Sequence, residues 1–413
     1  MKKTRILAMV MAGGEGSRLA PLTAERSKPS VPFGARYRIV DFVLSYLMNS
    51  GIHSIYLLVQ YKSQSLIEHV RKAWVLPPIL PEHFITVVPP QMRRGQVWFQ
   101  GTADAVHQNL NLIRQHRPDL VAVFGADHIY RMDVRQMVQF HLDNAAEATV
   151  AALPVPLKQA SAFGIIAADH RGRVRAFLEK PADPPAMASD PTRAYASMGN
   201  YLFNAEVLEQ ALIECHARGE NDFGKHVLPR LAGGGRLYAY NFADNRVPGV
   251  RDYEEHAYWR DVGTLDAYYE AHMDVLGLHP RFDVFNAQWP IFSSNYQGPV
   301  ARFQNAQIDN GMISAGCLID GARVKDSVLR REVVLEPGVE LTGCVIMDNV
   351  TIRAGAKLRR VIVDRYNIIE PNARIGFDPA EDAARYKVTE NGVVVLSEAQ
   401  PYETARTSFA EDS

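Results

Sequence analysis

The segment Ile6–Lys28, ILAMVMAGGEGSRLAPLTAERSK, joins an apolar run to a glycine-rich loop and then to two cations. The run Ile6–Met11 has the length and composition of a buried β-strand. The glycines that follow let backbone N–H groups approach a phosphate without a Cβ in the way. Arg18 and Lys28 add fixed positive charge, as phosphoryl and nucleotidyl transfer require. The segment therefore predicts a strand that ends in a phosphate-binding loop.

This loop differs from two other kinds of phosphate-binding loop. It is not a P-loop, because no GK[ST] follows the glycines. It also lacks the dinucleotide-binding fingerprint, because GGEG is spaced differently from GxGxxG and no acidic residue follows at the expected distance. A glycine turn without a ligand is the structural alternative, and the two cations favour the phosphate-binding interpretation.

Strand and helix patterns alternate over residues 1–276, which predicts βαβ units on a mainly parallel sheet. Such sheets bind ligands outside the carboxyl ends of their strands. The predicted strands are Ile6–Met11, Ile55–Val59, Val121–Gly125, Thr149–Val155, Val174–Leu178 and Leu237–Phe242. The predicted helices are Ile39–Asn49, Ala103–Arg114, Val134–Asn144 and Ala205–His216.

Residues 300–413 show a different pattern, a repeat of 17 residues. Short apolar strands separated by turn residues predict a three-sided parallel β-helix, whose inward side chains are buried only when coils stack. Unrelated hairpins in a sandwich are the alternative. It is disfavoured because several sets of repeated positions keep the same 17-residue spacing. Residues 277–299 are the predicted connection, and a strand at Gly392–Leu396 precedes an end that is expected to fray. The repeated positions are Gly321, Gly338, Gly355 and Asn372, then Val324, Leu341, Leu358 and Ile375, and then Leu335, Ile352 and Ile369.

Length, charge and cysteine content limit the class of protein. A chain of 413 residues is too long for one ordinary core and suggests two domains. The net charge of −1 argues against a nucleic-acid partner held by bulk attraction to phosphate. Cys215, Cys317 and Cys344 form no CxxC pair, which favours reduced thiols and a cytoplasmic location. No segment has the ~18 uninterrupted apolar residues that span a bilayer, so no membrane partner is expected.

The segment Val121–Asp133, VAVFGADHIYRMD, carries the first candidate metal ligand. Asp127 follows an apolar strand by two turn residues, where an open α/β sheet presents its ligands. Mg²⁺ needs one or two carboxylates together with substrate phosphates. Asp261, in YWRDVGT, is the distant candidate for the same ion, but spacing alone does not bring the two together. A helix N-cap is the structural alternative for Asp127.

The order of these loops resembles that of ADP-glucose pyrophosphorylases, the glucose-1-phosphate adenylyltransferases of bacterial type. The order is AGGEGSRL, SKP, Gln91 followed by GTADAV, FGADHIYRMD, FGII, FLEKP, SMGNYLF, NDFGKHVLP and YWRDVGTLDAYYEAH. The resemblance covers essentially the whole chain, and the full series, with FGARYRIVDFVLSYLMNSGI, is highly specific. It implies a Rossmann-like mixed or parallel sheet in a nucleotidyltransferase domain, followed by a left-handed parallel β-helix. It also implies that ATP and glucose 1-phosphate react to give ADP-glucose and pyrophosphate, for glycogen synthesis.

The resemblance assigns roles to individual residues. Arg18 and Lys28 would stabilise charge at the α-phosphorus and on pyrophosphate, while Asp127 and Asp261 would hold the catalytic Mg²⁺. The nucleotide-binding residues would be Gly13, Gly14, Gln91 and Gly101, the last two at adenine. The sugar-phosphate residues would be Gly164, Glu179, Lys180, Ser197 and Asp222, with Lys180 on the phosphate of glucose 1-phosphate. The plainer alternatives are a turn at Gly164, a strand hydroxyl at Ser197, an N-cap at Asp222 and a solvated pair at Glu179 and Lys180.

Assembly and regulation are also implied. Members of the family are usually tetramers with sugar-phosphate activators bound between the two domains, so a homotetramer and an anionic effector are expected. Arg36, together with Arg38, is the expected contact for that effector. A surface arginine on a loop is the alternative.

Three positions depart from the family pattern. Glu15 stands where many bacterial members carry Arg, Phe99 replaces a Tyr common in WYRGTADAV, and Asn200 replaces an apolar residue close to the sugar. They leave the strictness for ATP and glucose 1-phosphate open. The alternatives are a relative that uses another NTP or sugar 1-phosphate, a catalytically silent regulatory subunit, and a β-helix acyltransferase. Retention of Arg18 and Lys28 disfavours the silent subunit, and a repeat region without histidine disfavours the acyltransferase.

Overall fold

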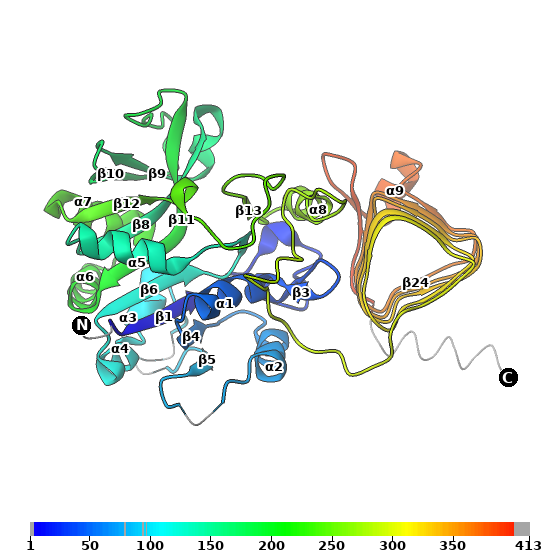
Figure 1. Ribbon diagram of the computed structural model, residues 1–413, viewed down its shortest axis with the longest axis horizontal. Coiled ribbons are helices and arrows are strands. Elements are labelled where there is room, and N and C mark those ends of the chain that lie inside the picture. Colours follow the sequence, from blue (N-terminus) through cyan, green and yellow to red (C-terminus); the bar gives the residue numbers. More distant parts are fainter. Residues whose placement is uncertain (1–3, 78–79, 93–94, 96, 400–413) are drawn as a thin grey trace.

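The computed structural model describes residues 4–77, 80–92, 95 and 97–399, and a mixed sheet forms the centre of its first part (Figure 1). The strand order is β10-β9-β11-β6-β1-β4-β5, and β8 pairs with both β11 and β12. The strands are β1 (Ile6–Met11), β4 (Ser54–Leu58), β5 (Phe84–Val88), β6 (Leu120–Gly125), β8 (Ala148–Pro156), β9 (Gly164–Ala168), β10 (Val174–Glu179), β11 (Arg193–Asn204) and β12 (Leu237–Asn241). All of the strands predicted in this part are present, with ends within one residue of the expected ones.

The sheet is parallel only on one side. β1, β4, β5 and β6 run parallel, whereas β11 runs antiparallel to β6, β8 and β9. The sequence did not predict β11, in which an alternation of buried and partly buried residues passes into a continuously buried run, Asn200–Phe203. The expectation of a mainly parallel sheet therefore holds for the first half, and β11 makes the whole sheet mixed.

Helices cover both faces of this sheet, as Figure 1 shows. The helices on one face are α3 (Thr102–His107), α4 (Leu110–His116), α6 (Ala205–Ala217) and α7 (Leu228–Gly234). Those on the other face are α1 (Ile39–Asn49), α2 (Gln64–Ala73) and α5 (Val134–Asp143). The single helix predicted over Ala103–Arg114 is in fact two, because the Asn109 side chain donates to the Ala105 carbonyl and its φ of −113° leaves the helical region. None of the described helices is long and apolar enough to cross a membrane.

The second part is a parallel β-helix with a triangular cross-section, seen end-on in Figure 1. Val324, Leu341, Leu358 and Ile375 pair in register, which confirms the 17-residue repeat. The turn positions Gly321, Gly338, Gly355 and Asn372 all have positive φ, which explains why glycine or asparagine recurs there. Its strands are β14 (Arg302–Gln304), β15 (Gln307–Ile313), β16 (Leu318–Asp320), β17 (Arg323–Leu329), β18 (Val334–Leu335), β19 (Glu340–Thr342), β20 (Val345–Ile346), β21 (Thr351–Ile352), β22 (Lys357–Arg359), β23 (Val361–Val363), β24 (Ile368–Ile369), β25 (Arg374–Ile375), β26 (Lys387–Val388) and β27 (Val394–Leu396). Helix α9 (Pro379–Arg385) precedes β26, and the end that is expected to fray lies largely outside the described residues.

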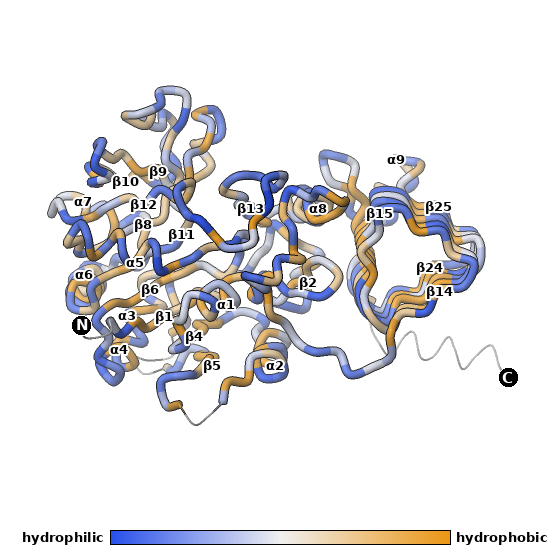
Figure 2. The backbone as a smooth tube through the Cα atoms, in the orientation of Figure 1, coloured by the Kyte–Doolittle hydropathy of each residue, from blue (hydrophilic) through white to orange (hydrophobic). Residues whose placement is uncertain are grey.

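The β-helix packs against the segment that follows the glycine loop. The face of the coil toward the sheet domain is apolar in Figure 2, and Val345, Ile362 and Val395 share one buried cluster with Phe33 and Tyr268. Phe33 belongs to β2 (Pro32–Phe33), which pairs with β3 (Tyr37–Arg38), and Tyr268 belongs to α8 (Leu265–Met273). This contact fixes the chain shortly after Lys28 and shortly after Asp261.

Charged groups reinforce the same contact. The buried guanidinium of Arg26 donates to Asp364 of the β-helix, and its Nε donates to the Leu22 carbonyl at 2.8 Å. Arg330 Nη1 donates to the carbonyls of Gly34 and Tyr37, each at 2.9 Å. Because a buried charge without its partner is strongly destabilising, these pairs specify how the two parts dock.

Candidate active site

A cavity of about 420 Å³ opens at the carboxyl ends of β1, β4 and β6. Gly13 and Gly14 follow β1, Gln60 follows β4, and Asp127 follows β6, and all of them line the cavity. Open α/β sheets bind ligands at this edge. The rest of the lining includes Lys28, Phe99, Gly101, Thr102, His128, Glu179, Tyr201, Asp222 and Gly224.

Lys28 bridges two carboxylates at one corner of this cavity. Its Nζ lies 3.1 Å from Asp127 Oδ2 and 3.1 Å from Asp261 Oδ1. The strand β13 (Trp259–Asp261) pairs with β7 (His128–Tyr130) so that Asp261 lies opposite His128, the residue after Asp127. Ligand atoms of Asp127, His128 and Asp261 lie within 4.8 Å of one another. The two aspartates that sequence spacing could not connect therefore share one site.

The charges of this corner stabilise one another. Desolvation alone would raise the pKa of Asp127, but His128 and Lys28 outweigh it and hold that pKa well below its ordinary value. Desolvation would likewise lower the pKa of Lys28, but Asp127 and Asp261 outweigh it and raise that pKa. Asp127 lines the cavity, and Asp261 adjoins it on the other side of the Lys28 ammonium. Two carboxylates open to a phosphate-sized cavity suit Mg²⁺, so the residues fit the ion.

The glycine loop packs closely against Lys28 and Gln60, which its glycines make possible. A Cβ on Gly16 would lie 2.9 Å from Lys28 Cβ, and the φ of +70° at Gly16 disfavours any other residue. A Cβ on Gly13 would lie 3.3 Å from Gln60 Cβ. Gly14 has no atom within 4 Å of its Cβ position, so its backbone is open to a ligand. The loop thus holds Lys28 in place while exposing backbone to the cavity.

Glu179 and Asp222 line another part of the cavity. Glu179 Oε2 lies 3.0 Å from the Cβ position of Gly164 and 2.8 Å from that of Gly224, so both glycines make room for this carboxylate. Burial and the neighbouring Asp222 raise the pKa of Glu179. Asp222 accepts from the Lys225 backbone N–H at 3.0 Å and from Thr102 Oγ1 at 3.1 Å. Asp222 is therefore an N-cap, as the plainer alternative proposed, and it also lines the cavity.

Comparison with known proteins matches this architecture over both parts. Residues 7–277 match the family model described as nucleotidyl transferase, and residues 299–396 match the one described as GlmU-like, C-terminal hexapeptide. Glucose-1-phosphate adenylyltransferase of Thermodesulfovibrio yellowstonii is 53% identical over 96% of this chain and 97% of its own. The enzymes of the same name from Corynebacterium jeikeium and Thermus thermophilus are 47% and 46% identical, over 95% and 96% of this chain and 98% and 99% of their own.

The chain belongs to the glucose-1-phosphate adenylyltransferase family. Most residues that the family resemblance assigned lie in or beside the cavity. Gly13, Gly14, Lys28, Gly101, Asp127, Glu179 and Asp222 line it. Asp261 adjoins it through Lys28, and a guanidinium nitrogen of the exposed Arg18 lies 3.1 Å from the Cβ position of Gly263, two residues beyond Asp261.

Other expected residues lie outside the cavity lining. Gln91 is exposed and donates to the Pro89 carbonyl at 2.7 Å, so adenine contact there requires the loop to move. Lys180 is exposed with φ of +48°, and Ser197 Oγ accepts from the Gly199 backbone N–H at 3.3 Å. Arg36 and Arg38 lie beside the β-helix contact rather than at the cavity, and Arg38 donates to the Ser65 carbonyl at 3.1 Å.

Of the departures from the family pattern, Phe99 lines the cavity and Asn200 does not. Asn200 is fully buried and donates to Tyr130 Oη at 2.7 Å. Its neighbours Gly199 and Tyr201 line the cavity, whereas the Asn200 side chain does not, and its closeness to the sugar stays a prediction.

Gln60, His128 and Tyr201 are among the cavity residues that sequence reasoning missed. Gln60 accepts from the Phe99 backbone N–H at 2.6 Å and so ties the loop that carries Phe99 to the end of β4. His128 Nδ1 lies 3.3 Å from Asp127 Oδ1. Tyr201 belongs to the unpredicted β11. Gln60 was detectable, since it follows a predicted strand at the ligand-binding edge just as Asp127 does.

The geometry at Gly101 makes a prediction about stability. Gly101→Ala places a methyl group 2.4 Å from the Asn221 carbonyl oxygen, so the backbone must shift and the free energy of unfolding should fall by about 1–3 kcal/mol. The matched control Gly14→Ala meets no atom within 4 Å and should change it by less than about 0.5 kcal/mol. Urea unfolding followed by circular dichroism measures both. Equal stability of the two variants would contradict the close contact of Gly101 with the Asn221 carbonyl in this wall of the cavity.

Proposed function

We propose that this protein transfers the adenylyl group of ATP to glucose 1-phosphate, with release of pyrophosphate and formation of ADP-glucose. The single observation that carries the proposal is the Lys28 ammonium between Asp127 and Asp261, beside an open glycine loop. Cations and a bed of backbone N–H groups are what nucleotidyl transfer needs where charge develops. The relatives that match nearly the whole chain are named for this activity.

The proposed reaction is an in-line displacement. A phosphate oxygen of glucose 1-phosphate forms a bond to the α-phosphorus of ATP, and the bond from that phosphorus to the bridging oxygen of pyrophosphate breaks. No proton has to move, because the attacking oxygen is already anionic. Gly13 and Gly14 receive the triphosphate, and Arg18 and Lys28 stabilise the negative charge that develops. Catalysis thus comes mainly from positioning and charge stabilisation.

Asp127 and Asp261 would hold Mg²⁺ in this scheme. When bound, the ion neutralises phosphate charge and orients the pyrophosphate leaving group. The Lys28 ammonium, now 3.1 Å from both carboxylates, is then free to pair with phosphate oxygens.

The remaining assignments complete the proposal. Gly101 and, after loop movement, Gln91 contact adenine. Gly164, Glu179, Lys180, Ser197 and Asp222 bind glucose 1-phosphate, with Lys180 on its phosphate. We take residues 1–276 as the catalytic domain, 277–299 as the connection and 300–413 as the β-helix domain. A cytoplasmic homotetramer that supplies glycogen synthesis is the corresponding cellular form.

An anionic effector site is proposed at Arg36 and Arg38. Arg36 is exposed and donates to Asn295 Oδ1 at 2.9 Å, next to the connection between the two parts. Burial, together with repulsion from the neighbouring Arg330 and Arg365, lowers the pKa of Arg38 to about 10. Such a concentration of positive charge at the contact between the two parts suits a sugar phosphate.

The metal assignment predicts a specific loss of turnover. Asp127→Asn should lower kcat by about 10²–10³-fold, because it removes charge stabilisation in the transition state, while KM for glucose 1-phosphate stays nearly constant. Initial rates of pyrophosphate release measure this, with Asp183→Asn, an exposed acid elsewhere, as the control. Turnover like that of the wild type in Asp127→Asn would overturn the proposal. A panel of NTPs and sugar 1-phosphates in the same assay tests the substrate assignment.

The effector assignment predicts weaker activation by sugar phosphates when Arg36 is replaced. Arg36→Ala should weaken activation by sugar phosphates about tenfold or more, since a hydrogen bond to a charged group contributes about 1.5–3 kcal/mol. Basal activity should stay unchanged, because Arg36 lies outside the cavity. Arg171→Ala, an exposed arginine distant from the contact in sequence, is the control for charge. Activation curves with the same midpoint in Arg36→Ala and wild type would contradict the assignment.

A further inference from the structure

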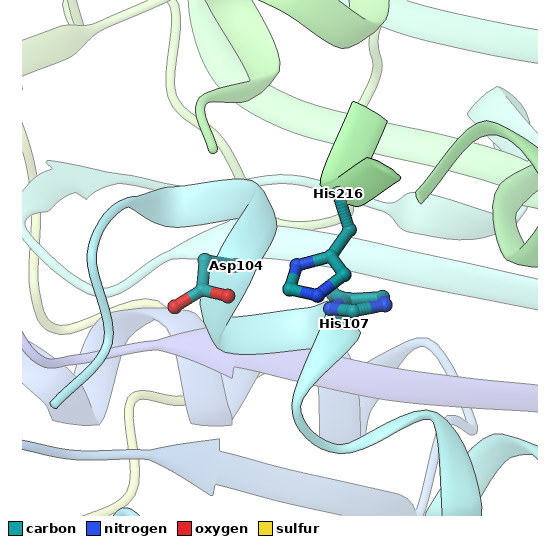
Figure 3. A group of neighbouring side chains, drawn as sticks. All are labelled: Asp104, His107 and His216. Atoms are coloured by element: carbon teal, nitrogen blue, oxygen red, sulfur yellow. The ribbon is translucent and has the colours of Figure 1, made fainter. Parts of the chain in front are cut away.

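Asp104, His107 and His216 form a second cluster of possible metal ligands, apart from the Asp127 site (Figure 3). Their ligand atoms all lie within 4.8 Å of one another. Asp104 and His107 belong to α3, and His216 lies near the end of α6. Residues three apart on a helix share a face, so α3 presents its carboxylate and its imidazole together toward α6.

The cluster is held in place from several sides. Asp104 and His107 are 9% and 3% exposed, and Asp104 Oδ2 accepts from the Gln100 backbone N–H at 2.8 Å and from Gln108 Nε2 at 2.7 Å. The rings of His107 and His216 stack with centroids 4.0 Å apart. Figure 3 shows the His216 ring over the His107 ring, with the Asp104 carboxylate beside the two rings. The carboxylate is therefore fixed where it faces two imidazoles.

The donor atoms of the cluster favour a divalent ion. The imidazole rings of His107 and His216 lie with their centroids 4.0 Å apart, and neutral imidazole is the form that binds metal. Two imidazoles with one carboxylate are a donor set suited to Zn²⁺ and related transition metals rather than to Mg²⁺. We infer that Asp104, His107 and His216 form a binding site for Zn²⁺ or a similar divalent transition-metal ion.

Access and coordination follow from the surroundings. His216 is exposed, so its ring can turn outward and admit the ion without opening the core. Cys215 and Glu220 line the same narrow gap. The ion is held by Asp104, His107 and His216, with water completing the coordination.

The site lies behind the wall of the substrate cavity. Gly101, which lines the cavity, directly precedes α3, and Asp222 follows the loop after α6. The Asn221 carbonyl accepts from the backbone N–H groups of Ala103 and Asp104, at 2.9 and 3.1 Å. A metal that joins α3 to α6 would add a further link between α3 and the segment after α6, and so would stiffen this wall of the cavity.

Calorimetric titration of Zn²⁺ into the metal-free, full-length protein in excess Mg²⁺ tests the inference. Wild type and the control His170→Ala, which removes an exposed histidine elsewhere, should each bind one equivalent. His216→Ala should bind at least about tenfold more weakly, because it removes one of three ligands. Asp104→Asn, which keeps the side-chain shape, should show the same loss. Thermal melting should show that Zn²⁺ raises the Tm of wild type and His170→Ala but not of His216→Ala.

Two results would overturn the inference. One is the absence of Zn²⁺ binding by the wild type, or equal affinity in His216→Ala. The other is binding that disappears in Asp261→Asn but persists in His216→Ala, since the ion would then occupy the Asp127 cluster. Circular dichroism of each variant establishes that a lost signal does not come from misfolding.

Discussion

The structure depends most on one ionic contact, in which the ammonium of Lys28 separates the carboxylates of Asp127 and Asp261. The three residues come from distant parts of the chain, and each needs a different support. Gly16 lets the glycine loop close over Lys28, β6 ends just before Asp127, and the pairing of β13 with β7 brings in Asp261. Without a cation between them, two such carboxylates would repel each other. Lys28 supplies this cation here, and a divalent ion would supply it when phosphates bind.

The β-helix takes part in this arrangement although none of its described residues lines the cavity. Arg26, two residues before Lys28, is bound to Asp364 of the coil, and Arg330 of the coil holds the carbonyls of Gly34 and Tyr37. The loop that carries Lys28 is therefore fastened on one side by the sheet and on the other by the coil. A shift of the coil would move Lys28 relative to Asp127, which gives a physical route from an effector near Arg36 to the cavity.

Local patterns in the sequence predicted what depends on local rules. The strand before the glycine loop, the position of Asp127 and the 17-residue repeat followed from periodicity and turn chemistry. The contact of Asp127 with Asp261 could not be predicted, because it rests on pairing between strands far apart in the chain. β11 was missed although half of it alternates between buried and partly buried residues, and the meeting of His107 with His216 depends on how two helices pack. The family resemblance named seven of the residues that line the cavity, but it could not show that Gln91 lies outside the lining.

The most direct test of the central claim is the position of a divalent ion in crystals grown with Mn²⁺ and a non-hydrolysable ATP analogue, located by anomalous scattering. We expect a Mn²⁺ peak between the carboxylates of Asp127 and Asp261, with the Lys28 ammonium displaced toward the phosphates. An unchanged bridge from Lys28 to both aspartates, with Mn²⁺ bound elsewhere along the triphosphate, would contradict the account.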